Sequence, residues 1–518
     1  MLDFSRLCTL PDVLAYHAQM QPEQIATEFQ GRSTTYRELH LRSDALARTL
    51  LQLHPAPRSR VAYLGKNSDR YFELMFAVAK ACKVLVPLNW RLTLDEWSYI
   101  LDDADATCLF TDSSFSAAGK ELAERLPLAA RVPIDGSWDY LFNNDSTETI
   151  FGPFTATDIA LQIYTSGTTG KPKGVLLSHT NILALREPGL RAELEWFARE
   201  SDTSLVVMPV AHIAGTAYGL FGLHSGGRLV ICQEFDAAQV WHQLRHAGVT
   251  HMLLAPTALR MLLEAHVGTE MYAPHLRYVT YGGSPIDAAV LQQAIARLKC
   301  GFTQMYGMTE TAGGVVALTP RDHEQGQTGL ITCAGRAMLG AEIGIVDNNG
   351  QPLPCGETGE IVVRSAAVMA GYWRQPLATA LAIDEEGWLR TGDIGRIDPQ
   401  GYLTVVDRAK DTIITGGENV YPLEVENRLR EHPSVADVAV IGVPSSKWGE
   451  EVKAIIVPAH TGLFDADVLL SYARQHLAAY KVPKSVERVS ELPRNAAGKV
   501  LRRILREPYW AAKPTRIG

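Results

Sequence analysis

Short apolar runs alternate with longer segments of helical periodicity from about residue 35 to residue 330. The runs that predict buried strands lie at residues 60–65, 84–89, 107–112, 205–210, 251–256 and 278–283. The segments between them that carry apolar side chains at helical spacing include residues 68–82, 236–247 and 285–298. A chain that alternates strand and helix in this way forms parallel sheets covered by helices on both faces. The sequence therefore predicts an α/β fold with more than one parallel sheet.

The chain is too long, at 518 residues, to fold around one hydrophobic core. At about residues 335–407 the helical pattern gives way to β-rich flanks around an Asn349–Gly350 turn, which predicts a small antiparallel unit. A mixed pattern follows, with a helix predicted near residues 467–479. We therefore expect an N-terminal domain at residues 1–408, which contains the antiparallel unit, and a small α+β C-terminal domain at residues 409–518.

The composition is that of an ordinary globular enzyme, with 46% hydrophobic and 20% charged residues. A net charge of −8 argues against a nucleic-acid partner. No apolar run is long enough to cross a membrane, and the N-terminus lacks the apolar stretch of a secretion signal. The seven cysteines are dispersed without a C-x-x-C pair, which favours reduced thiols over disulfides or zinc. We expect a cytoplasmic protein without integral membrane association; the sequence leaves a homodimer open.

Residues 164–174, YTSGTTGKPKG, combine three glycines, hydroxyl side chains and two lysines directly after an apolar run. Glycines let backbone N–H groups converge on an anion, hydroxyls donate to its oxygens, and lysines add positive charge. The spacing is not that of the common P-loop, because Thr165 and Pro172 stand where that motif needs a glycine and a Ser or Thr. A flexible linker is the alternative, but the paired lysines after a buried strand favour a phosphate-binding loop.

Two further segments, YGGSPI at 281–286 and QMYGMTETAGG at 304–314, place glycines and hydroxyls at the predicted carboxyl end of a strand. Ligands bind at such strand ends in open α/β sheets. Tyr306 could stack on a purine base, Thr309 could donate to a phosphate, and Glu310 could hold Mg²⁺. Taken singly, a tyrosine is more often a core residue and a glutamate more often a solvated acid.

Three polar residues stand in predicted turns or loops toward the C-terminus. Asp393 lies in a Thr-Gly-Asp turn, where a carboxylate could accept hydrogen bonds from two sugar hydroxyls. Arg408 could be a second contact to ribose or phosphate, and Lys499 follows an Ala-Gly pair. Each has a plainer interpretation, since Asp393 could be an ordinary turn residue and Lys499 a surface lysine that only aids solubility.

Together these segments resemble one family. YTSGTTGKPKG, YGMTE, the Thr-Gly-Asp turn, DRAKD, GGENVYPLEVE and the terminal Gly-Lys follow the order and spacing of the adenylate-forming superfamily. That superfamily includes acyl-CoA synthetases, peptide-synthetase adenylation domains and firefly luciferase, and the chain most resembles the acyl-CoA synthetase branch. The similarity extends from about residue 10 to residue 510. It implies two parallel α/β subdomains and a small β-barrel-like unit, followed by a mobile C-terminal lid.

The resemblance also implies a two-step reaction that uses ATP, Mg²⁺ and coenzyme A. The acid would attack the α-phosphorus of ATP to give an acyl-AMP and pyrophosphate, and the coenzyme A thiol would then displace AMP. The residues implied for the β- and γ-phosphates are Thr165, Ser166, Gly167, Thr168, Thr169 and Lys173. Those implied for the nucleoside are Gly282, Gly283, Ser284, Tyr306, Gly307 and Met308 around adenine, and Asp393 and Arg408 at the ribose. Glu310, with Thr168, would position Mg²⁺, and Thr309 would act beside it.

Lys499 is the implied catalytic cation of the C-terminal domain. It would contact the bridging oxygen and the carboxylate, and its role would be electrostatic, because an unperturbed lysine pKa of about 10.4 keeps it charged at neutral pH. The family rotates its C-terminal domain between the two steps, about a hinge that corresponds to Lys410. After rotation, Gly416, Gly417 and Glu418 would line the pantetheine tunnel.

His212 is implied beside the reacting carboxylate of the acid, as a catalytic and substrate-binding residue. Amino-acid-activating relatives have an aspartate at the next position, where this chain has Ile213, so a cationic substrate is disfavoured. The apolar and small residues implied around the acyl group are Gly215, Ala217, Gly219, Gly282, Gly307 and the run Gly313, Gly314, Val315 and Val316. They predict an uncharged tail, and hence a medium- or long-chain fatty acid. The alternatives are an aryl or alicyclic acid, a ligase that loads a carrier protein, a catalytically inactive binding protein, and a luciferase-like oxygenase.

Replacing Lys499 with alanine is expected to abolish acyl-AMP formation, because one preorganised charge typically contributes on the order of 3–4 kcal/mol to the transition state. Thioester formation from supplied acyl-AMP should continue almost unchanged, since the second step uses the other domain orientation. Pyrophosphate release and thioester formation, measured separately, check this expectation. An equal loss of both half-reactions would contradict the role of Lys499.

Overall fold

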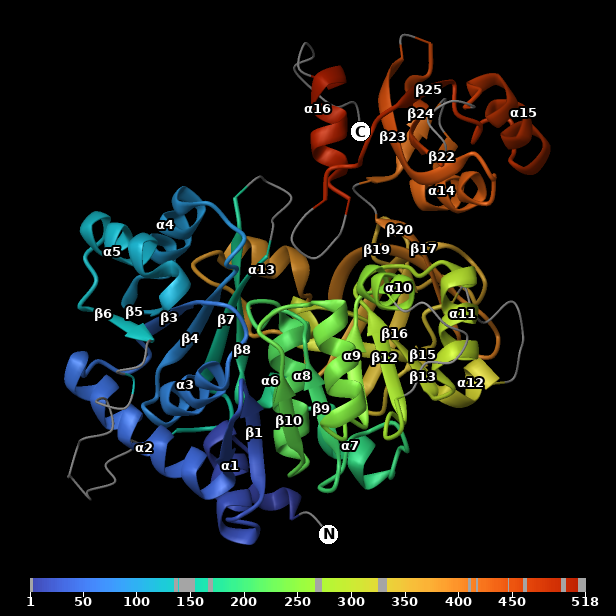
Figure 1. Cartoon of the computed structure of the whole chain (residues 1–518). Helices are drawn as coiled ribbons and strands as arrows, with labels where there is room; N and C mark the ends of the chain where they lie inside the picture. Colours follow the sequence, from blue (N-terminus) through green and yellow to red (C-terminus); the bar gives the residue numbers. More distant parts are fainter. Residues whose placement is uncertain are drawn as a thin grey trace. The chain divides into compact units, whose positions relative to one another are not determined.

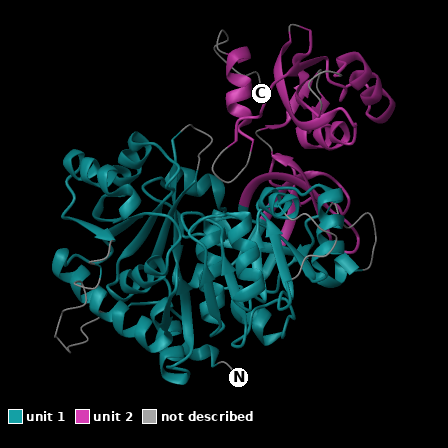
Figure 2. Ribbon diagram, viewed as in Figure 1, with its two compact units in different colours: residues 1–342, 363–389 teal, residues 343–362, 390–518 magenta. Residues whose placement is uncertain are grey.

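The computed structural model describes residues 3–134, 138, 154–165, 171–265, 273–324, 333–408, 411–415, 418–445, 447–459, 464–494 and 500–510. The chain forms two compact units (Figure 2), which are residues 1–342 with 363–389 (unit 1) and residues 343–362 with 390–518 (unit 2). This division differs from the boundary expected after residue 408, because most of the antiparallel segment groups with the C-terminal residues. That domain boundary stays a prediction.

The larger sheet of unit 1 has a parallel centre and antiparallel edges (Figure 1). Its strands lie in the order β15 (Arg336–Ala337), β14 (Gly313–Leu318), β13 (Gly301–Met308), β12 (Tyr278–Gly282), β11 (His251–Leu254), β9 (Thr203–Val206), β10 (Arg228–Ile231), β1 (Ile25–Phe29) and β2 (Arg32–Thr35). The pairs from β13 to β1 are parallel, and β14, β15 and β2 pair antiparallel. The carboxyl ends of β12 and β13 therefore meet at the same edge of the sheet.

The smaller sheet of unit 1 is built in the same way. Its order is β18 (Gly371–Tyr372), β8 (Lys173–Ser178), β7 (Ile159–Thr165), β4 (Val84–Leu88), β3 (Arg60–Leu64), β5 (Ala106–Asp112) and β6 (Ala130–Ile134). The pairs from β7 to β6 are parallel, whereas β8 pairs antiparallel with both β7 and β18. The predicted parallel α/β class is confirmed. Each predicted strand overlaps an observed one, although β9 ends at Val206 where the prediction extends to residue 210.

The helices of unit 1 connect these strands. They are η1 (Phe4–Arg6), α1 (Leu10–Met20), α2 (Tyr36–Leu53), α3 (Asp69–Lys80), α4 (Leu94–Asp103), η2 (Ser113–Phe115), α5 (Ser116–Arg125), α6 (His179–Leu183), α7 (Arg186–Arg191), α8 (Ile213–His224), α9 (Ala237–His246), α10 (Pro256–Glu264), α11 (Ala288–Leu298), η4 (Thr309–Thr311), α12 (Pro320–Glu324) and α13 (Pro376–Ala382). Local sequence patterns determine where several of these helices begin. At α2, for example, Thr35 and Glu38 form a capping box that satisfies two backbone N–H groups.

The larger sheet is covered on one face by α9, α10 and α11. Their apolar side chains form a buried cluster with residues of β9, β11 and β12, in which Trp241, Leu259 and Leu291 are 4%, 0% and 0% exposed. Each of these helices carries apolar residues at helical spacing, as the sequence predicts. Their packing holds the strands whose carboxyl ends carry the predicted nucleotide-binding segments.

Helix α8 packs closely against α3 of the smaller sheet and against strand β10 of the larger one. A Cβ added at Gly219 would lie 2.3 Å from the Phe72 ring of α3, and one at Gly222 would lie 2.6 Å from Leu229 of β10. The Tyr71 and Thr216 hydroxyls join the two helices by a hydrogen bond of 2.5 Å. The glycines of α8 thus allow one helix to contact both layers.

Unit 2 contains two sheets that are smaller still. The first has the order β16 (Ala341–Val346), β17 (Gly359–Ser365), β19 (Leu389–Ile397) and β20 (Leu403–Arg408). Strands β16 and β19 begin, and β17 ends, in residues that group with unit 1. The second has the order β22 (Glu418–Val420), β21 (Ile413–Thr415), β24 (Gly449–Pro458) and β23 (Val435–Ser445), with β25 (Ser485–Arg488) parallel to β24. Its helices are α14 (Pro422–Arg430), α15 (Ala466–His476) and α16 (Arg502–Trp510). In the described residues the first sheet is an open path of strands, which corrects the expectation of a barrel-like unit.

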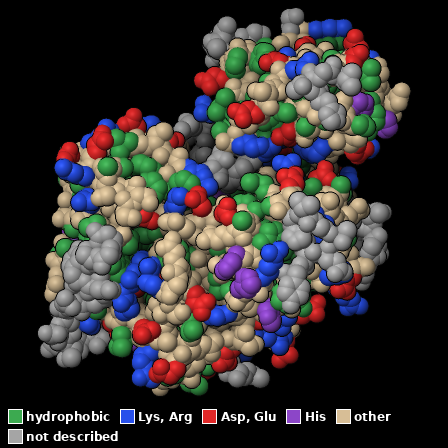
Figure 3. All heavy atoms as spheres, in the orientation of Figure 1, with side chains coloured by type: hydrophobic (Ala, Val, Ile, Leu, Met, Phe, Trp, Pro, Cys, Tyr) green, Lys and Arg blue, Asp and Glu red, His purple; other side chains and the backbone are tan. Residues whose placement is uncertain are grey.

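The surface carries charges of both signs. Acidic and basic side chains are interspersed over the face shown in Figure 3, without a basic stripe among the described residues of that face. Over the part of the chain that the structure describes, no helix combines the length and the apolar character needed to cross a membrane.

Gly219→Ala is expected to lower the free energy of unfolding by about 1–3 kcal/mol, because overpacking against Phe72 outweighs the better helix propensity of alanine. Urea denaturation of the full chain measures this change. The double variant Gly219→Ala/Phe72→Leu should recover part of the loss, since leucine frees space at the contact. A more stable Gly219→Ala protein would contradict this account of α8.

Candidate active site

The ends of the predicted phosphate loop are held together by strand pairing. β7 ends at Thr165 and β8 begins at Lys173, and these two residues lie opposite each other in the antiparallel register. Ser166, Gly167, Thr168 and Thr169 lie outside the described residues. The described flanks therefore fix where the loop leaves and re-enters the smaller sheet.

Tyr372 connects the end of this loop to Glu310. Its hydroxyl donates to Oε1 of Glu310 over 2.9 Å, and Nζ of Lys173 lies 4.9 Å from the centroid of its ring. Burial, together with the charge of Glu310, raises the pKa of Tyr372, so the hydroxyl stays protonated and keeps its role as donor. Sequence analysis missed Tyr372, because no local pattern distinguishes it from other aromatic residues in a β-rich segment.

The short segment that carries Tyr372 is joined by backbone hydrogen bonds to strand β8 and to Glu310. Tyr372 pairs with Val175 of β8, and Trp373 N donates to the carbonyl oxygen of Gly174 over 2.8 Å. Met369 N donates to the carbonyl oxygen of Glu310 over 2.8 Å. These bonds bring a residue from position 372 to two motifs that precede it by about 200 and 60 positions in the sequence.

A tight turn closes the Tyr-Gly-Met-Thr-Glu segment. Oγ1 of Thr311 accepts from Met308 N over 2.9 Å and lies 2.7 Å from the carbonyl oxygen of Gly313. Ala312 and Gly313 have φ angles of 51° and 122°, and a Cβ on Gly307 would lie 1.9 Å from the Gly313 carbonyl oxygen. Such strained backbone concentrates at functional sites. The turn holds Thr309 and Glu310, which are 7% and 6% exposed, in the short helix η4.

The residues predicted to surround adenine lie at the carboxyl ends of two adjacent parallel strands. Gly282 of β12 pairs with Met305 of β13. The predicted set consists of Gly282 and the residues that directly follow this pair on the two strands: Gly283, Ser284, Tyr306, Gly307 and Met308. Gly283 has a φ angle of 79°, and no atom lies within 4 Å of where its Cβ would stand. The backbone at Gly283 is therefore accessible on that side.

In unit 2, Asp393 and Arg408, which the sequence predicts as ribose contacts, lie close together. They are opposite each other in the β19–β20 register, and Nε of Arg408 lies 3.2 Å from Oδ1 of Asp393. Thr391 supports the turn, because its hydroxyl accepts from Asp393 N over 3.1 Å and donates to the carbonyl oxygen of Ile361 over 2.8 Å. The pairing leaves a carboxylate and a guanidinium side by side.

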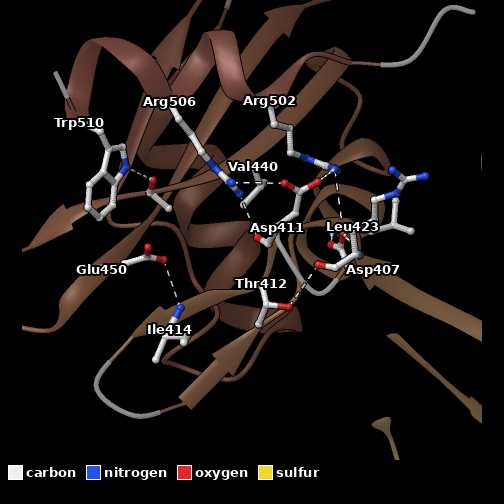
Figure 4. A network of polar contacts seen from close by, with 12 residues as sticks. Asp407, Asp411, Thr412, Ile414, Leu423, Val440, Glu450, Arg502, Arg506 and Trp510 are labelled. Atoms are coloured by element: carbon white, nitrogen blue, oxygen red, sulfur yellow. Dashed lines mark hydrogen bonds and ion pairs between the residues drawn. The ribbon is translucent and has the colours of Figure 1, made fainter. Parts of the chain in front are cut away.

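A buried ion-pair network lies in unit 2 around the segment that contains the predicted hinge (Figure 4). Nη2 of Arg502 is 2.8 Å from both carboxylate oxygens of Glu426, and its Nη1 is 3.2 Å from Oδ2 of Asp411. Arg506 also contacts Asp411, and Asp407 accepts from Leu423 N over 2.6 Å. Burial raises the pKa of Asp407 to about 6, although the nearby Arg502 charge opposes this.

Several predicted residues of unit 2 fall outside the described part of the chain. These are Lys410, Gly416, Gly417 and Lys499. Glu418 begins β22 and is exposed. The Arg502 network nevertheless joins the flanks of two of these segments, because Asp407 and Asp411 stand on either side of residues 409–410 and Arg502 follows Lys499 by three positions.

His212 is the N-cap of α8. Its Nδ1 accepts from Ala214 N over 3.3 Å, and its side chain is exposed. A Cβ on Gly215 would lie 2.3 Å from the carbonyl oxygen of Pro209, so this glycine is needed for backbone packing. Gly215 and Gly219 do not line the cavity found beside α8, in contrast to the small-residue pocket expected from the sequence. Gly313 faces Ala217, with 4.0 Å between the added Cβ and that of Ala217.

The cavity beside α8 lies within unit 1 and reaches the turn that follows Glu310. It has an empty volume of about 650 Å³, which includes space open to solvent. Its walls include Thr311, Ala312 and Gly314 from the turn. The aromatic and ionisable side chains in its lining are Arg186, Trp196, Phe197, Tyr218, Phe221 and His251. The cavity is therefore aromatic, with a cation in its wall.

Comparison with known proteins identifies the family. Residues 14–373 match the family model described as AMP-binding enzyme, and residues 424–499 match the AMP-binding enzyme C-terminal domain. The chain belongs to the AMP-binding enzyme family. It is an AMP-forming acid–thiol ligase, and the prediction of the adenylate-forming superfamily is confirmed.

Three similar proteins illustrate the range within this family. A fatty acid–[acyl-carrier-protein] ligase of Streptomyces coeruleorubidus is 37% identical, with 100% of this chain and 99% of the relative covered. A feruloyl-CoA synthase of Amycolatopsis sp. is 38% identical, with 95% and 97% covered. The structure of o-succinylbenzoate CoA synthetase from Bacillus subtilis in complex with its acyl-adenylate intermediate has a TM-score of 0.84 and 32% identity, with 95% and 97% covered. The AMP-binding fold is common to them, whereas their named acids differ.

Arg502→Met is expected to lower the free energy of unfolding by about 3–5 kcal/mol, because it leaves Glu426 buried without its cation and removes one of the two arginines that contact Asp411. Its neighbour Arg503 provides the control. The Arg503 side chain is 76% exposed, so Arg503→Met should change the free energy of unfolding by less than about 0.5 kcal/mol. Chemical denaturation of both variants measures the difference, and equal effects would contradict a structural role for the network.

Proposed function

We propose that this ligase converts a carboxylic acid into its coenzyme A thioester through an acyl-AMP. The carboxylate oxygen attacks the α-phosphorus of ATP and pyrophosphate leaves; the thiol sulfur then attacks the acyl carbonyl, AMP leaves, and the thiol proton is released. The observation that carries this proposal is the match of both family models to a chain in which Glu310, Lys173 and the Asp393–Arg408 pair occupy ordered positions. Members solved with ATP and magnesium support the same cosubstrates here.

The residues of unit 1 fit a triphosphate. Thr165 and Lys173 flank the loop proposed to bind the β- and γ-phosphates, together with Ser166, Gly167, Thr168 and Thr169. The chain supplies hydroxyls, backbone amides and a lysine there, which suit an anion. Tyr306 would stack on adenine at the carboxyl end of β13, with Ser284 and the backbone of Gly282 and Gly283 along its edge.

Glu310 fits a magnesium ion that is shared with the phosphates. Mg²⁺ is usually held by one or two carboxylates plus substrate phosphates and water. Among the described residues no group of three His, Cys, Asp or Glu side chains could hold a metal by itself, so a single buried carboxylate is what the structure offers. When bound, Mg²⁺ neutralises charge on the phosphates. Tyr372 keeps the Glu310 carboxylate oriented through its hydrogen bond.

The residues of unit 2 would hold the ribose and supply the catalytic cation. The carboxylate of Asp393 can accept from two sugar hydroxyls, and Arg408 neutralises its charge at 3.2 Å. Lys499 would offset the negative charge that develops at the α-phosphorus, and a turn about Lys410 would then withdraw it and bring Gly416, Gly417 and Glu418 to the pantetheine. These roles rest on position-by-position similarity to the family.

The acceptor is proposed to be coenzyme A. A carrier protein is the second candidate, because the similar protein from Streptomyces coeruleorubidus is named as a fatty acid ligase for acyl-carrier protein. Incubation with ATP, acid and either free coenzyme A or a phosphopantetheinylated carrier protein separates the two by the thioester that forms.

The acid is proposed to be one with an aromatic or polar tail. A medium- or long-chain fatty acid is the expectation from sequence, and the name of the Streptomyces relative supports it. The cavity beside α8 supports the aryl alternative instead, because Trp196, Phe197 and Phe221 provide flat faces and Arg186 provides a charge. The feruloyl-CoA synthase at 38% identity agrees with an aryl acid.

Exchange of labelled pyrophosphate into ATP, measured with a panel of fatty and aryl acids, tests the reaction. Glu310→Gln should reduce exchange by about 10²-fold or more, because it removes the charge that positions the metal. Tyr372→Phe should reduce it less, by about tenfold, and raise the Mg²⁺ concentration needed for half-maximal exchange.

The half-exposed Tyr480 provides the control, since Tyr480→Phe should leave exchange unchanged. No exchange with any acid would refute the proposed reaction. A Tyr372→Phe enzyme with an unchanged Mg²⁺ requirement would refute the role of Tyr372.

A further inference from the structure

The aromatic cavity beside α8 contains polar atoms that the folded chain leaves unsatisfied. Nε of Arg186 and Nε2 of His251 are buried and have no hydrogen-bond partner among the described residues. The buried hydroxyl of Tyr218 forms no hydrogen bond of good geometry there, although Ser204 lies near it. All three side chains line the same cavity. Buried polar groups in native proteins are normally paired, since an unpaired one costs the full loss of its hydration. Three such atoms around one empty space indicate a ligand group that pairs with them.

Arg186 is the strongest of these signals, because it is a buried charge. It is 6% exposed, and among the described residues no carboxylate forms an ion pair with it. Its Nη2 donates to Ser225 Oγ over 2.9 Å and lies 3.3 Å from the carbonyl oxygen of Phe221. Burial lowers the pKa of Arg186 to about 9, so the guanidinium is still a cation at neutral pH.

Aromatic rings hold this cation in place but do not neutralise it. The guanidinium carbon of Arg186 lies 4.4 Å from the ring centroid of Phe197 and 4.7 Å from that of Phe221. Such contacts stabilise a cation only partly, and they fix the plane of the guanidinium. A planar, immobilised guanidinium is suited to bind a carboxylate through two parallel hydrogen bonds.

The other titratable groups of this region do not provide the missing negative charge. Asp202 is the nearby acid, and it pairs with Arg277 and accepts from Arg199 N over 2.8 Å. Burial lowers the pKa of His251 to about 4 and that of His224 well below its usual value, so both are neutral at pH 7. The cavity wall thus keeps a net positive charge.

We propose that the acid activated by this enzyme carries a second carboxylate at the end remote from the reacting one, and that Arg186 and Tyr218 bind it. The inference rests on the proposed function, which places the reacting carboxylate near His212. Tyr218 would donate its hydroxyl to the second carboxylate, and the aromatic walls would enclose the carbon skeleton between the two ends. This replaces the uncharged tail expected from sequence with a dicarboxylic acid.

Helix α8 sets the separation of the two carboxylates. His212 caps its N-terminus, and Tyr218, Phe221 and Gly222 line the cavity further along the same helix. Six to ten residues at 1.5 Å per residue place these positions about 9–15 Å from His212 along the axis. A short diacid such as one of three or four carbons cannot span that distance, so the preferred substrate is longer or contains a ring.

Matched pairs of acids provide the test. The full-length enzyme is assayed by pyrophosphate exchange with straight-chain dicarboxylic acids of six to twelve carbons and with the monocarboxylic acids of equal length. A phenylpropanoic acid and its para-carboxy derivative extend the comparison to a ring. We expect kcat/KM to be at least about tenfold higher for the preferred diacid than for its monoacid, as a charge-assisted hydrogen bond provides.

Variants of the two binding residues connect that preference to the cavity. Arg186→Met should raise KM for the diacid by about tenfold or more without lowering kcat/KM for the monoacid, and so reduce or reverse the preference. Tyr218→Phe removes only an unpaired hydroxyl, so thermal unfolding should be unchanged while KM for the diacid rises several-fold. Arg191 lies on α7, as Arg186 does, but its side chain is 60% exposed and pairs with Glu187. Arg191→Met is the control and should leave kcat and KM unchanged for both the diacid and the monoacid.

The outcomes separate this inference from the proposed function. Exchange with monoacids but not with diacids would contradict the claim that the substrate carries a second carboxylate, and would leave the proposed ligase reaction intact. An equal loss for both acids in Arg186→Met and Tyr218→Phe would overturn their role in recognition and indicate a structural one. A preference for phenylpropanoic acid over its para-carboxy derivative would also overturn it. No exchange with any acid would refute the proposed function itself.

Discussion

The close packing of helix α8 against both layers of unit 1 is the constraint on which the site depends. Gly219 and Gly222 let the helix approach Phe72 of α3 and Leu229 of β10. Because the helix is fixed on two sides, its remaining face has a defined direction. That face carries Tyr218 and Phe221 into the cavity, and its N-cap presents His212. The glycines allow close packing, and the larger residues Tyr218 and Phe221 line the cavity.

The second organising element is the short segment around Tyr372. It reaches β8 through strand pairing and Glu310 through a backbone and a side-chain hydrogen bond. The strand that follows the predicted phosphate loop and the carboxylate proposed to hold magnesium therefore contact the same segment. Unit 2 has its own counterpart, in which Arg502 joins Glu426 to Asp411 near the predicted hinge. In both places, buried hydrogen bonds join segments that carry different parts of the proposed chemistry.

Much of the fold and of the nucleotide site could be predicted, because both depend on local patterns. The apolar runs gave each predicted strand, and parallel pairing follows from their alternation with helices. The positions of Asp393 and Arg408 were predicted from motifs, and their strands place them opposite each other. The cavity beside α8 could not be predicted in this way. Its lining comes from α7, α8, β11, β13 and the turn after Glu310, and no spacing in the sequence connects Arg186 to Tyr218 or His251.

The sequence by itself determined the α/β class, the order of the motifs and the family, because strand periodicity and glycine-rich loops are encoded within a few consecutive residues. Only the tertiary structure decided that the glycines of α8 pack against α3 and β10 and that Tyr372 reaches Glu310. It also decided that Arg186 is buried among aromatic rings and forms no ion pair within the described part of the chain. The physical reason is that burial and charge pairing depend on which distant segments meet. A lone arginine in a sequence gives no sign of whether water or a cavity will surround it.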